Sequence, residues 1–340
     1  MRTLRLGLIG YGNVNHSFVE LLHKKNSELR DRYGIAWIIT GIASRRIGWR
    51  SNSQGWKVSD LLHAKSAESL INMDGVACHD YKGWLDASRP DVVFEATSLS
   101  VEAGQPAVDH IRGSLEYGAH AITANKGPVV HAYAELKELA KRRGRQFLFE
   151  STVMDGVPIF SLFPNCLPAL EVTGFRGILN STTNVILSGM EQGLSFANSL
   201  ARAQAMGVAE TDSNYDIDGW DAAVKVSAIA TVVMGVQLPP LEVQREGIRG
   251  LSDEDVRDAR KAGTPYKLVC RAHRQGTGVI ASVRPEKIAL SDPMALVDGT
   301  SSIIQFETDI FPGLTITEEN PGLYATAYGM LADFIRAVNS

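Results

Sequence analysis

The stretch that decides the fold is LRLGLIGYGNVN, residues 4–15. Its apolar first half predicts a strand, and the apolar spacing that follows predicts a helix. Gly10 and Gly12 lie in the turn between them. The first glycine suits a tight turn, and the second lets the backbone approach a pyrophosphate, which the free N–H groups at a helix start bind well. Asn15 stands where a third glycine is usual. We expect a dinucleotide-binding turn, with an ordinary strand-to-helix turn as the open alternative.

Strand and helix patterns continue to alternate after this turn, up to about residue 150. Gly34, Gly118 and Gly144 each follow a helical pattern, where glycine commonly ends a helix. This alternation implies a parallel sheet with helices on both faces, so we expect a Rossmann-type, doubly wound α/β domain over residues 1–150. The expected strands cover residues 4–9, 35–43, 91–96, 120–123 and 146–150, and the expected helices cover 13–33, 107–117 and 132–143. Residues 48–78 give no clear pattern.

The pattern changes after residue 150. Residues 172–179 and 268–285 have the composition of strands, with no helical pattern between neighbouring strands. This indicates a mixed or antiparallel sheet, and hence a second domain of the α+β class. Residues 322–338 return to helical spacing.

Composition narrows the class of protein. The chain has 340 residues, a net charge of −4 and 44% hydrophobic residues, so no basic excess is present to hold nucleic acid or an acidic membrane surface. No apolar run approaches the roughly 18 residues of a membrane span. Cys78, Cys166 and Cys270 are scattered, which argues against a disulfide framework or zinc site and fits a reducing compartment. We expect a cytoplasmic protein with a small-molecule partner.

The end of the second expected strand predicts which dinucleotide binds. An NAD-specific domain usually carries an acidic residue there, to bind the ribose hydroxyl. This chain instead has Ser44, Arg45 and Arg46. Because arginine suits a 2′-phosphate, we expect NADP(H) to be preferred over NAD(H). A solvated basic loop is the alternative.

The acidic stretch AETDSNYDIDGWDAAVK, residues 209–225, leads directly into the apolar run VSAIATVVMG. Asp221 and Lys225 are four residues apart and share one face of a helix. A lysine partly buried beside a carboxylate can pass a proton to an oxygen that gains charge in a reaction. The other carboxylates of the stretch suit an ammonium group on the substrate. An exposed ion pair beside a solvated acidic loop is the alternative, and spacing alone favours it.

Two polar clusters follow expected strands. TANKGPV places Asn125 and Lys126 at a strand end of the first domain, where ligands lie in doubly wound sheets. ILNSTTN, residues 178–184, places a run of Asn, Ser and Thr after a strand of the second domain. Turn chemistry and helix capping are the alternatives for both clusters.

Together these motifs resemble homoserine dehydrogenase, in the family's order and over nearly the whole chain. The matching motifs are GYGNV (10–14), TANKGPV (123–129), ESTVMDGVPIF (150–160), ILNSTTN (178–184), GVAETDSNYDIDGWDAAVK (207–225) and NPGLYATAYGMLADF (320–334). The family interconverts aspartate 4-semialdehyde and homoserine with NAD(P)H, on the path to threonine and methionine.

The resemblance implies roles for individual residues. Lys225 looks like the catalytic lysine, Asp221 its partner and Lys126 a second lysine near the substrate and the nicotinamide. The implied substrate-binding residues are Glu210, Asp216 and Thr182. The implied cofactor-binding residues are Gly10, Gly12, Asn13, Val14, Ser44, Arg45, Arg46, Thr97, Asn125, Lys126 and Gly322.

The resemblance also implies a monovalent cation, usually sodium, held by Glu150 and by the backbone carbonyls of Val153, Asp155 and Val157. It implies a homodimer formed through the second domain, over residues 151–312, and a C-terminal helix within residues 313–340 that returns to the first domain. We expect a short form, without the C-terminal regulatory domain or the aspartate kinase domain of other members.

The chain departs from the family at several positions. Met154 and Asp155 replace glycine-rich positions, Ser181 and Val185 replace a glycine and an aromatic residue, and Asn15 replaces the third glycine of the turn. Such changes leave open the same chemistry on another short oxo acid or amino aldehyde. A non-catalytic NADP(H)-binding protein is a further alternative, which the Asp221 and Lys225 pair disfavours.

Overall fold

The computed structural model describes residues 3–339, which form two compact units. The first unit ends at Ile159 and resumes at Gly322, and the second covers Phe160–Pro321. Both boundaries fall later than residues 150 and 312. Residues 151–159 belong to the first unit because they bond to its last helix, for example through the Ser151 hydroxyl and the carbonyl of Thr326 at 2.8 Å.

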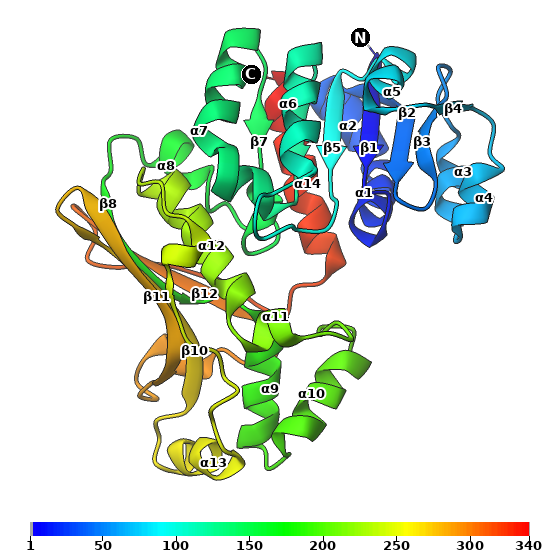
Figure 1. Cartoon of the computed structure of the whole chain (residues 1–340). Coiled ribbons are helices and arrows are strands. Elements are labelled where there is room, and N and C mark those ends of the chain that lie inside the picture. Colours follow the sequence, from blue (N-terminus) through cyan, green and yellow to red (C-terminus); the bar gives the residue numbers. More distant parts are fainter. Residues whose placement is uncertain (1–2, 340) are drawn as a thin grey trace. The chain divides into compact units, whose positions relative to one another are not determined.

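The first unit is built on a seven-stranded sheet of order β4-β3-β2-β1-β5-β6-β7 (Figure 1). The five neighbouring strands β2, β1, β5, β6 and β7 are parallel, which confirms the predicted doubly wound sheet. Residues 48–78, unassigned from sequence, add two antiparallel edge strands and a pair of short helices. The strands are β1 (Thr3–Ile9), β2 (Ala36–Ser44), β3 (Gly48–Ser51), β4 (Val76–Cys78), β5 (Val92–Glu95), β6 (His120–Thr123) and β7 (Phe147–Leu148).

Two predicted helices of this unit were wrong in extent. The single helix expected over 13–33 is broken at Lys25, whose φ of −96° and ψ of 7° are not helical. The helix expected from Ala132 begins at Lys126, because Asn125 caps it, and Ala132 marks a kink within it. The helices are α1 (Asn13–Lys24), α2 (Asn26–Tyr33), α3 (Val58–His63), α4 (Ala67–Ile71), α5 (Tyr81–Ser88), α6 (Ala107–Tyr117) and α7 (Lys126–Arg143).

The last helix, α14 (Leu323–Asn339), completes the core of the first unit. Met330 and Phe334 are fully buried. The ring of Phe334 lies 5.7 Å from that of Phe94 on β5, and Phe94 lies 4.4 Å from Phe18 on α1. Burying each such side chain contributes about 1.5–3 kcal/mol, so α14 is an integral part of this unit.

The second unit is built on a six-stranded sheet of order β13-β12-β8-β10-β11-β9 (Figure 1). Its pairs are antiparallel except for β9 with β11, so the predicted mixed sheet is confirmed. The strands are β8 (Val172–Ile178), β9 (Gln244–Arg245), β10 (Tyr266–Gln275), β11 (Gly278–Lys287), β12 (Ser302–Thr308) and β13 (Leu314–Glu318).

Helices of the second unit carry the acidic stretch. Gly219, at φ +80°, precedes the buried helix α12, which packs on β10 and β11. The helices are α8 (Leu162–Cys166), α9 (Ser181–Glu191), α10 (Phe196–Ala205), α11 (Asn214–Ile217), α12 (Trp220–Val233) and α13 (Asp253–Lys261). In the part of the chain that the structure describes, no helix combines the length and apolarity needed to cross a bilayer.

Candidate active site

The glycine turn after β1 has the shape of an anion cradle. Gly10 adopts a φ of +77°, and a Cβ there would lie 2.5 Å from the carbonyl oxygen of Ala96, so only glycine fits. Gly12 is the N-cap of α1 and gives that helix no side-chain cap. The first N–H groups of a helix lack intrahelical partners and favour an anion. The turn therefore fits the pyrophosphate of a dinucleotide.

Asn15 stabilises this turn in place of the usual third glycine. Its side chain is fully buried. Nδ2 donates to the carbonyl of Ile9 at 3.0 Å and to that of Gly10 at 3.1 Å. The departure at this position thus bonds the start of α1 to the end of β1 and leaves the cradle intact.

A cavity of about 350 Å³ adjoins the glycine turn, and it collects part of the predicted cofactor set. Gly12, Asn13, Ser44 and Arg46 line it, whereas Arg45 does not. The turn between α3 and α4 also lines the cavity and includes Lys65. Sequence reasoning missed this lysine because residues 48–78 showed no period.

Thr97 and Asn125, both predicted cofactor residues, meet at the ends of β5 and β6. Asn125 caps α7 by accepting from the N–H of Gly127 at 2.8 Å, and its Nδ2 donates to the carbonyl of Thr97 at 3.0 Å. Asn125 therefore does cap a helix, which was the alternative interpretation, and its two bonds fix the orientation of its side-chain amide. Lys126 is the first residue of α7.

A buried carboxylate, missed from sequence, supports the same strand ends. Glu95 accepts hydrogen bonds from the Thr97 N–H at 2.8 Å and from the Thr123 hydroxyl at 2.7 Å. Burial raises the pKa of Glu95. The residue shows no sequence signal, because β5 reads as a buried strand throughout.

The loop predicted to bind a cation, residues 150–157, begins with Glu150, whose carboxylate forms an ion pair. Glu150 Oε2 lies 3.1 Å from a guanidinium nitrogen of Arg336 on α14. The Glu150 N–H donates to Asp333 Oδ2 at 2.8 Å. Burial raises the pKa of Asp333 to about 7. The side chain of Glu150 thus already has a cationic partner.

The rest of that loop is irregular backbone. Met154 and Asp155 take φ values of 51° and 54°, the left-handed region that glycine usually fills. The carbonyl of Val157 accepts from the N–H of Ile159 at 2.8 Å, and Asp155 accepts from the hydroxyl of Thr326. Across residues 3–339 no group of three His, Cys, Asp or Glu residues could hold a metal ion.

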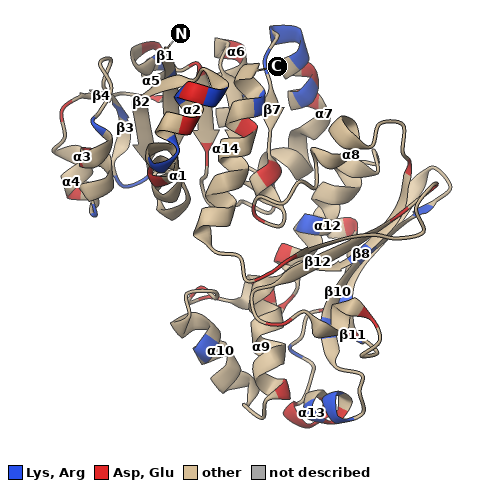
Figure 2. Cartoon of the chain, turned by 180° about the vertical axis from the view of Figure 1, so that it is seen from behind, with Lys and Arg blue, Asp and Glu red and all other residues tan. Residues whose placement is uncertain are grey.

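In the second unit, Lys225 and Asp221 form a close and largely buried ion pair. Lys225 Nζ lies 2.8 Å from Asp221 Oδ2, with 17% and 14% of their side chains exposed. Nζ also donates to the carbonyl of Leu179 at 2.6 Å. Figure 2 shows α12 as a mostly uncharged helix, whereas α13 carries charged positions of both signs. The alternative of an exposed surface pair is therefore wrong.

Asp216 and Thr182 join the same cluster. The Thr182 hydroxyl donates to Asp216 Oδ2 at 3.1 Å. Asn180 Nδ2 donates to Asp216 Oδ1 at 2.7 Å and to Asp221 Oδ2 at 2.9 Å. Burial, and then the nearby charge of Asp221, raise the pKa of Asp216. The sequence placed Asn180 in a polar cluster, with helix capping as the alternative, and did not predict its bonds to the two carboxylates.

Two predicted residues lie apart from these clusters. The side chain of Glu210 is exposed in the loop after α10, and its carbonyl accepts from the Ser213 hydroxyl at 2.5 Å. Gly322 is exposed just before α14.

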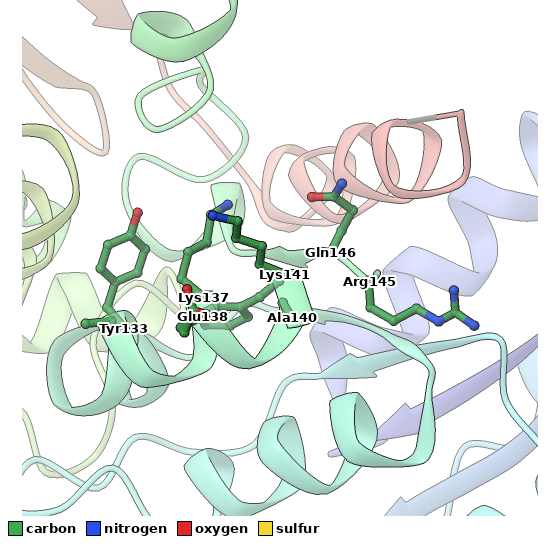
Figure 3. Close-up of a pocket in the computed structure, with 9 residues that line it drawn as sticks. Tyr133, Lys137, Glu138, Ala140, Lys141, Arg145 and Gln146 are labelled. Atoms are coloured by element: carbon green, nitrogen blue, oxygen red, sulfur yellow. The ribbon is translucent and has the colours of Figure 1, made fainter. Parts of the chain in front are cut away.

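A further cavity, of about 390 Å³, lies along α7 in the first unit (Figure 3). Tyr133, Lys137 and Lys141 direct their polar ends toward it. Burial is the main cause of a lowered pKa of Lys137. No residue predicted for the cofactor or the substrate lines this cavity, so the cavity beside the glycine turn is the better candidate for the dinucleotide.

Comparison with known proteins gives one consistent family. The homoserine dehydrogenase model matches residues 158–335, and the homoserine dehydrogenase NAD binding domain matches residues 10–150. The NAD(+)-dependent homoserine dehydrogenase of Pseudomonas canavaninivorans is 33% identical, over 98% of this chain and 96% of its own length. The homoserine dehydrogenase of Methanocaldococcus jannaschii is 37% identical, over 98% of each chain. The crystal structure of a homoserine dehydrogenase from Thiobacillus denitrificans aligns with a TM-score of 0.83 at 28% identity, over 99% of this chain and 73% of the other.

Proposed function

Since this chain belongs to the homoserine dehydrogenase family, whose members are NAD(P)-dependent oxidoreductases acting on CH–OH groups, we propose that it interconverts L-aspartate 4-semialdehyde and L-homoserine with NADP(H). The observation that carries the proposal is the pair of Lys225 and Asp221, held in a largely buried cluster with Asp216 and Thr182. A protein that only binds a dinucleotide has no use for a lysine and two carboxylates held in this way.

In the proposed mechanism, Lys225 supplies the proton. NADPH, when bound at the glycine turn, would supply the hydride that reduces the aldehyde carbon of the semialdehyde. Negative charge then develops on the aldehyde oxygen, and Lys225 Nζ protonates it to give the alcohol. Asp221, 2.8 Å from Nζ, favours the ammonium form before transfer and holds its direction. In homoserine oxidation the same nitrogen takes the proton back.

Two acidic side chains of residues 207–225 are proposed to bind the ammonium group of the substrate. Asp216 and Glu210 are assigned to this role from the motif 207–225. Asp216 lies within the cluster, whereas Glu210 lies on an exposed loop. A Glu210→Gln variant should therefore raise the KM for homoserine while leaving the affinity for the dinucleotide unchanged.

The preference for NADP(H) is proposed from two cations beside the glycine turn. Arg46 and Lys65 line the same cavity, and a 2′-phosphate would be bound by both. The relative from Pseudomonas canavaninivorans is named for NAD(+), so NAD(H) is the alternative cofactor to test. Values of kcat/KM measured with both dinucleotides test the proposal, and equal values would contradict it.

A monovalent cation is proposed for the loop 150–157. Because Glu150 already pairs with Arg336, the backbone carbonyls of Val153, Asp155 and Val157 are the ligands that carry this proposal. Carbonyl oxygens suit hard cations. Replacing Na⁺ by tetramethylammonium at constant ionic strength should lower both the rate and the melting temperature. A melting temperature that does not depend on Na⁺ would contradict the site.

A homodimer is proposed through the second unit. Exposed apolar side chains of this unit, at Leu296, Ile310 and Phe311, are 66%, 66% and 40% exposed. Light scattering during size exclusion should give twice the mass of the 36.9 kDa chain. A charged substitution at Ile310 should raise the monomer fraction.

The function itself is tested by incubating the purified protein with L-homoserine and NADP⁺ and following absorbance at the nicotinamide band. Homoserine-dependent reduction supports the proposal. If the protein turns over another short oxo acid or amino aldehyde and does not turn over homoserine, that compound is the substrate instead. Dinucleotide binding without turnover of any of these substrates would leave only the binding role.

A further inference from the structure

Asn180 stands between the two carboxylates of the candidate active site. It is 4% exposed and is the N-cap of α9. Its Nδ2 donates one hydrogen to Asp216 Oδ1 at 2.7 Å and one to Asp221 Oδ2 at 2.9 Å. A single neutral amide therefore joins residues from two different helices, α11 and α12.

The orientation of this amide is fixed from its other side. Asn180 Oδ1 accepts from the Thr183 N–H at 2.8 Å and from the Thr183 hydroxyl at 2.7 Å. Both of these partners are donors, whereas Asp216 and Asp221 are acceptors, so only one assignment of oxygen and nitrogen satisfies all four contacts. The helix cap thus aims the amide hydrogens at the carboxylates.

The two carboxylates gain from such a donor because they carry like charges in a largely buried cluster. Lys225 lies 2.8 Å from Asp221 and also donates to the carbonyl of Leu179, the residue before Asn180. The like charges of Asp216 and Asp221 repel each other, and partial burial strengthens the repulsion. A donor without charge stabilises both anions and does not compete with Lys225 as a cation.

We infer that Asn180 is a positioning residue for the proposed reaction: its amide bridge keeps Asp216 and Asp221 together and anionic, and thereby keeps Lys225 a charged proton donor. This role rests on the proposed function for its effect on turnover. The bridge itself is a property of the folded chain and is testable without turnover.

Loss of the amide bridge should change how the reaction rate depends on pH. Burial and Asp221 raise the pKa of Asp216, and the bond from Asn180 lowers it. The other titratable groups that face the cluster are Lys225, the Tyr215 phenol and the Cys270 thiol, and burial raises the pKa of the last two. Without the bridge the carboxylates hold a proton to higher pH, so the acid limb of the rate profile should move to higher pH.

The decisive variant is Asn180→Ser. Serine is a good N-cap and keeps an acceptor for the Thr183 N–H, but it lacks the two amide hydrogens. We expect kcat at pH 7 to fall about tenfold to a hundredfold, with an acid limb at higher pH and an unchanged affinity for NADPH. Ser195→Ala is the matched control, since it removes the side-chain cap of α10, another helix of the second unit, and leaves the bridge untouched. Its profile should match that of the wild type.

Either of two kinetic outcomes would overturn the inference: an Asn180→Ser enzyme with the wild-type pH profile, or an equal loss of turnover in both variants. Asn180→Asp, which also keeps the cap acceptor, serves if the serine variant does not fold, and it should lose more activity because it adds a third carboxylate. The ¹³C NMR titration of the aspartate carboxyls separates the two proposals. An inactive wild type refutes the proposed function, whereas a titration that Asn180→Ser leaves unchanged refutes the bridge.

Discussion

Replacing Lys225 by methionine tests the central chemical role. Methionine is close to lysine in length and removes the ammonium group without opening a large cavity. In the folded chain Nζ bonds to Asp221 at 2.8 Å and to the carbonyl of Leu179 at 2.6 Å, with 17% of the side chain exposed. In the methionine variant, water therefore has limited access to take the place of the ammonium group.

The expected magnitude follows from these contacts. A positioned proton donor contributes about 10²–10⁴ in rate, or roughly 3–5 kcal/mol of the barrier. We expect a loss of kcat in this range for Lys225→Met. The variant also leaves Asp221 without its ammonium partner, and breaking a buried ion pair costs about 3–5 kcal/mol of stability.

The assay measures semialdehyde reduction by NADPH absorbance, together with NADPH affinity by fluorescence titration. Affinity should not change, because the predicted dinucleotide residues belong to the first unit. The control is Lys267→Met, which removes another buried lysine of the second unit, one bonded to the carbonyl of Val297 at 2.8 Å and to Asp298 at 3.1 Å. The control should lose stability and keep its rate. A Lys225→Met enzyme within tenfold of wild-type kcat would refute the reasoning.

Three further predictions concern the first unit. Arg46→Asp should lower kcat/KM for NADP(H) by about 10–100-fold, since a charge-assisted bond to phosphate is worth about 1.5–3 kcal/mol, and should spare NAD(H); a parallel loss with both would contradict the role. Burial raises the pKa of Asp333 to about 7, so the folded state keeps a proton that the unfolded chain releases above its lower pKa. This stabilisation is complete below the unfolded pKa and is lost as pH rises through 7; Asp333→Asn should flatten that decline in urea unfolding, and an unchanged slope would show that Asp333 does not cause it. Gly10→Ala should abolish dinucleotide binding, because its Cβ would lie 2.5 Å from the Ala96 carbonyl; binding measured by calorimetry at wild-type affinity would disprove the cradle.

Sequence reasoning succeeded where the physics is local. The glycine turn and the alternating apolar runs predicted the parallel sheet, since both follow from neighbouring residues. The spacing of Asp221 and Lys225 predicted a shared helix face, and the structure adds that this face is largely buried. Spacing could not decide burial, because an exposed pair has the same period.

The missed features depend on residues far apart in the chain. Asn180 lies 36 residues from Asp216 and 41 from Asp221, so its bridge has no local pattern. Lys65 lies in a segment whose two strands form through pairing of β3 with β2 and of β4 with β3. The break at Lys25 was missed because apolar spacing on either side fits one helix, while the polar residues at the break carry no period.

The placement of α14 has a consequence for how the protein is made. Residues 160–321 are continuous in sequence, so the second unit can fold as soon as it has left the ribosome. The first unit cannot, because its core includes Phe334, which is translated after the whole of the second unit. Until then the surface around Phe18 and Phe94 lacks its cover. During synthesis the segment that begins first should therefore mature last, and chaperones that bind apolar surface should associate with it until α14 arrives.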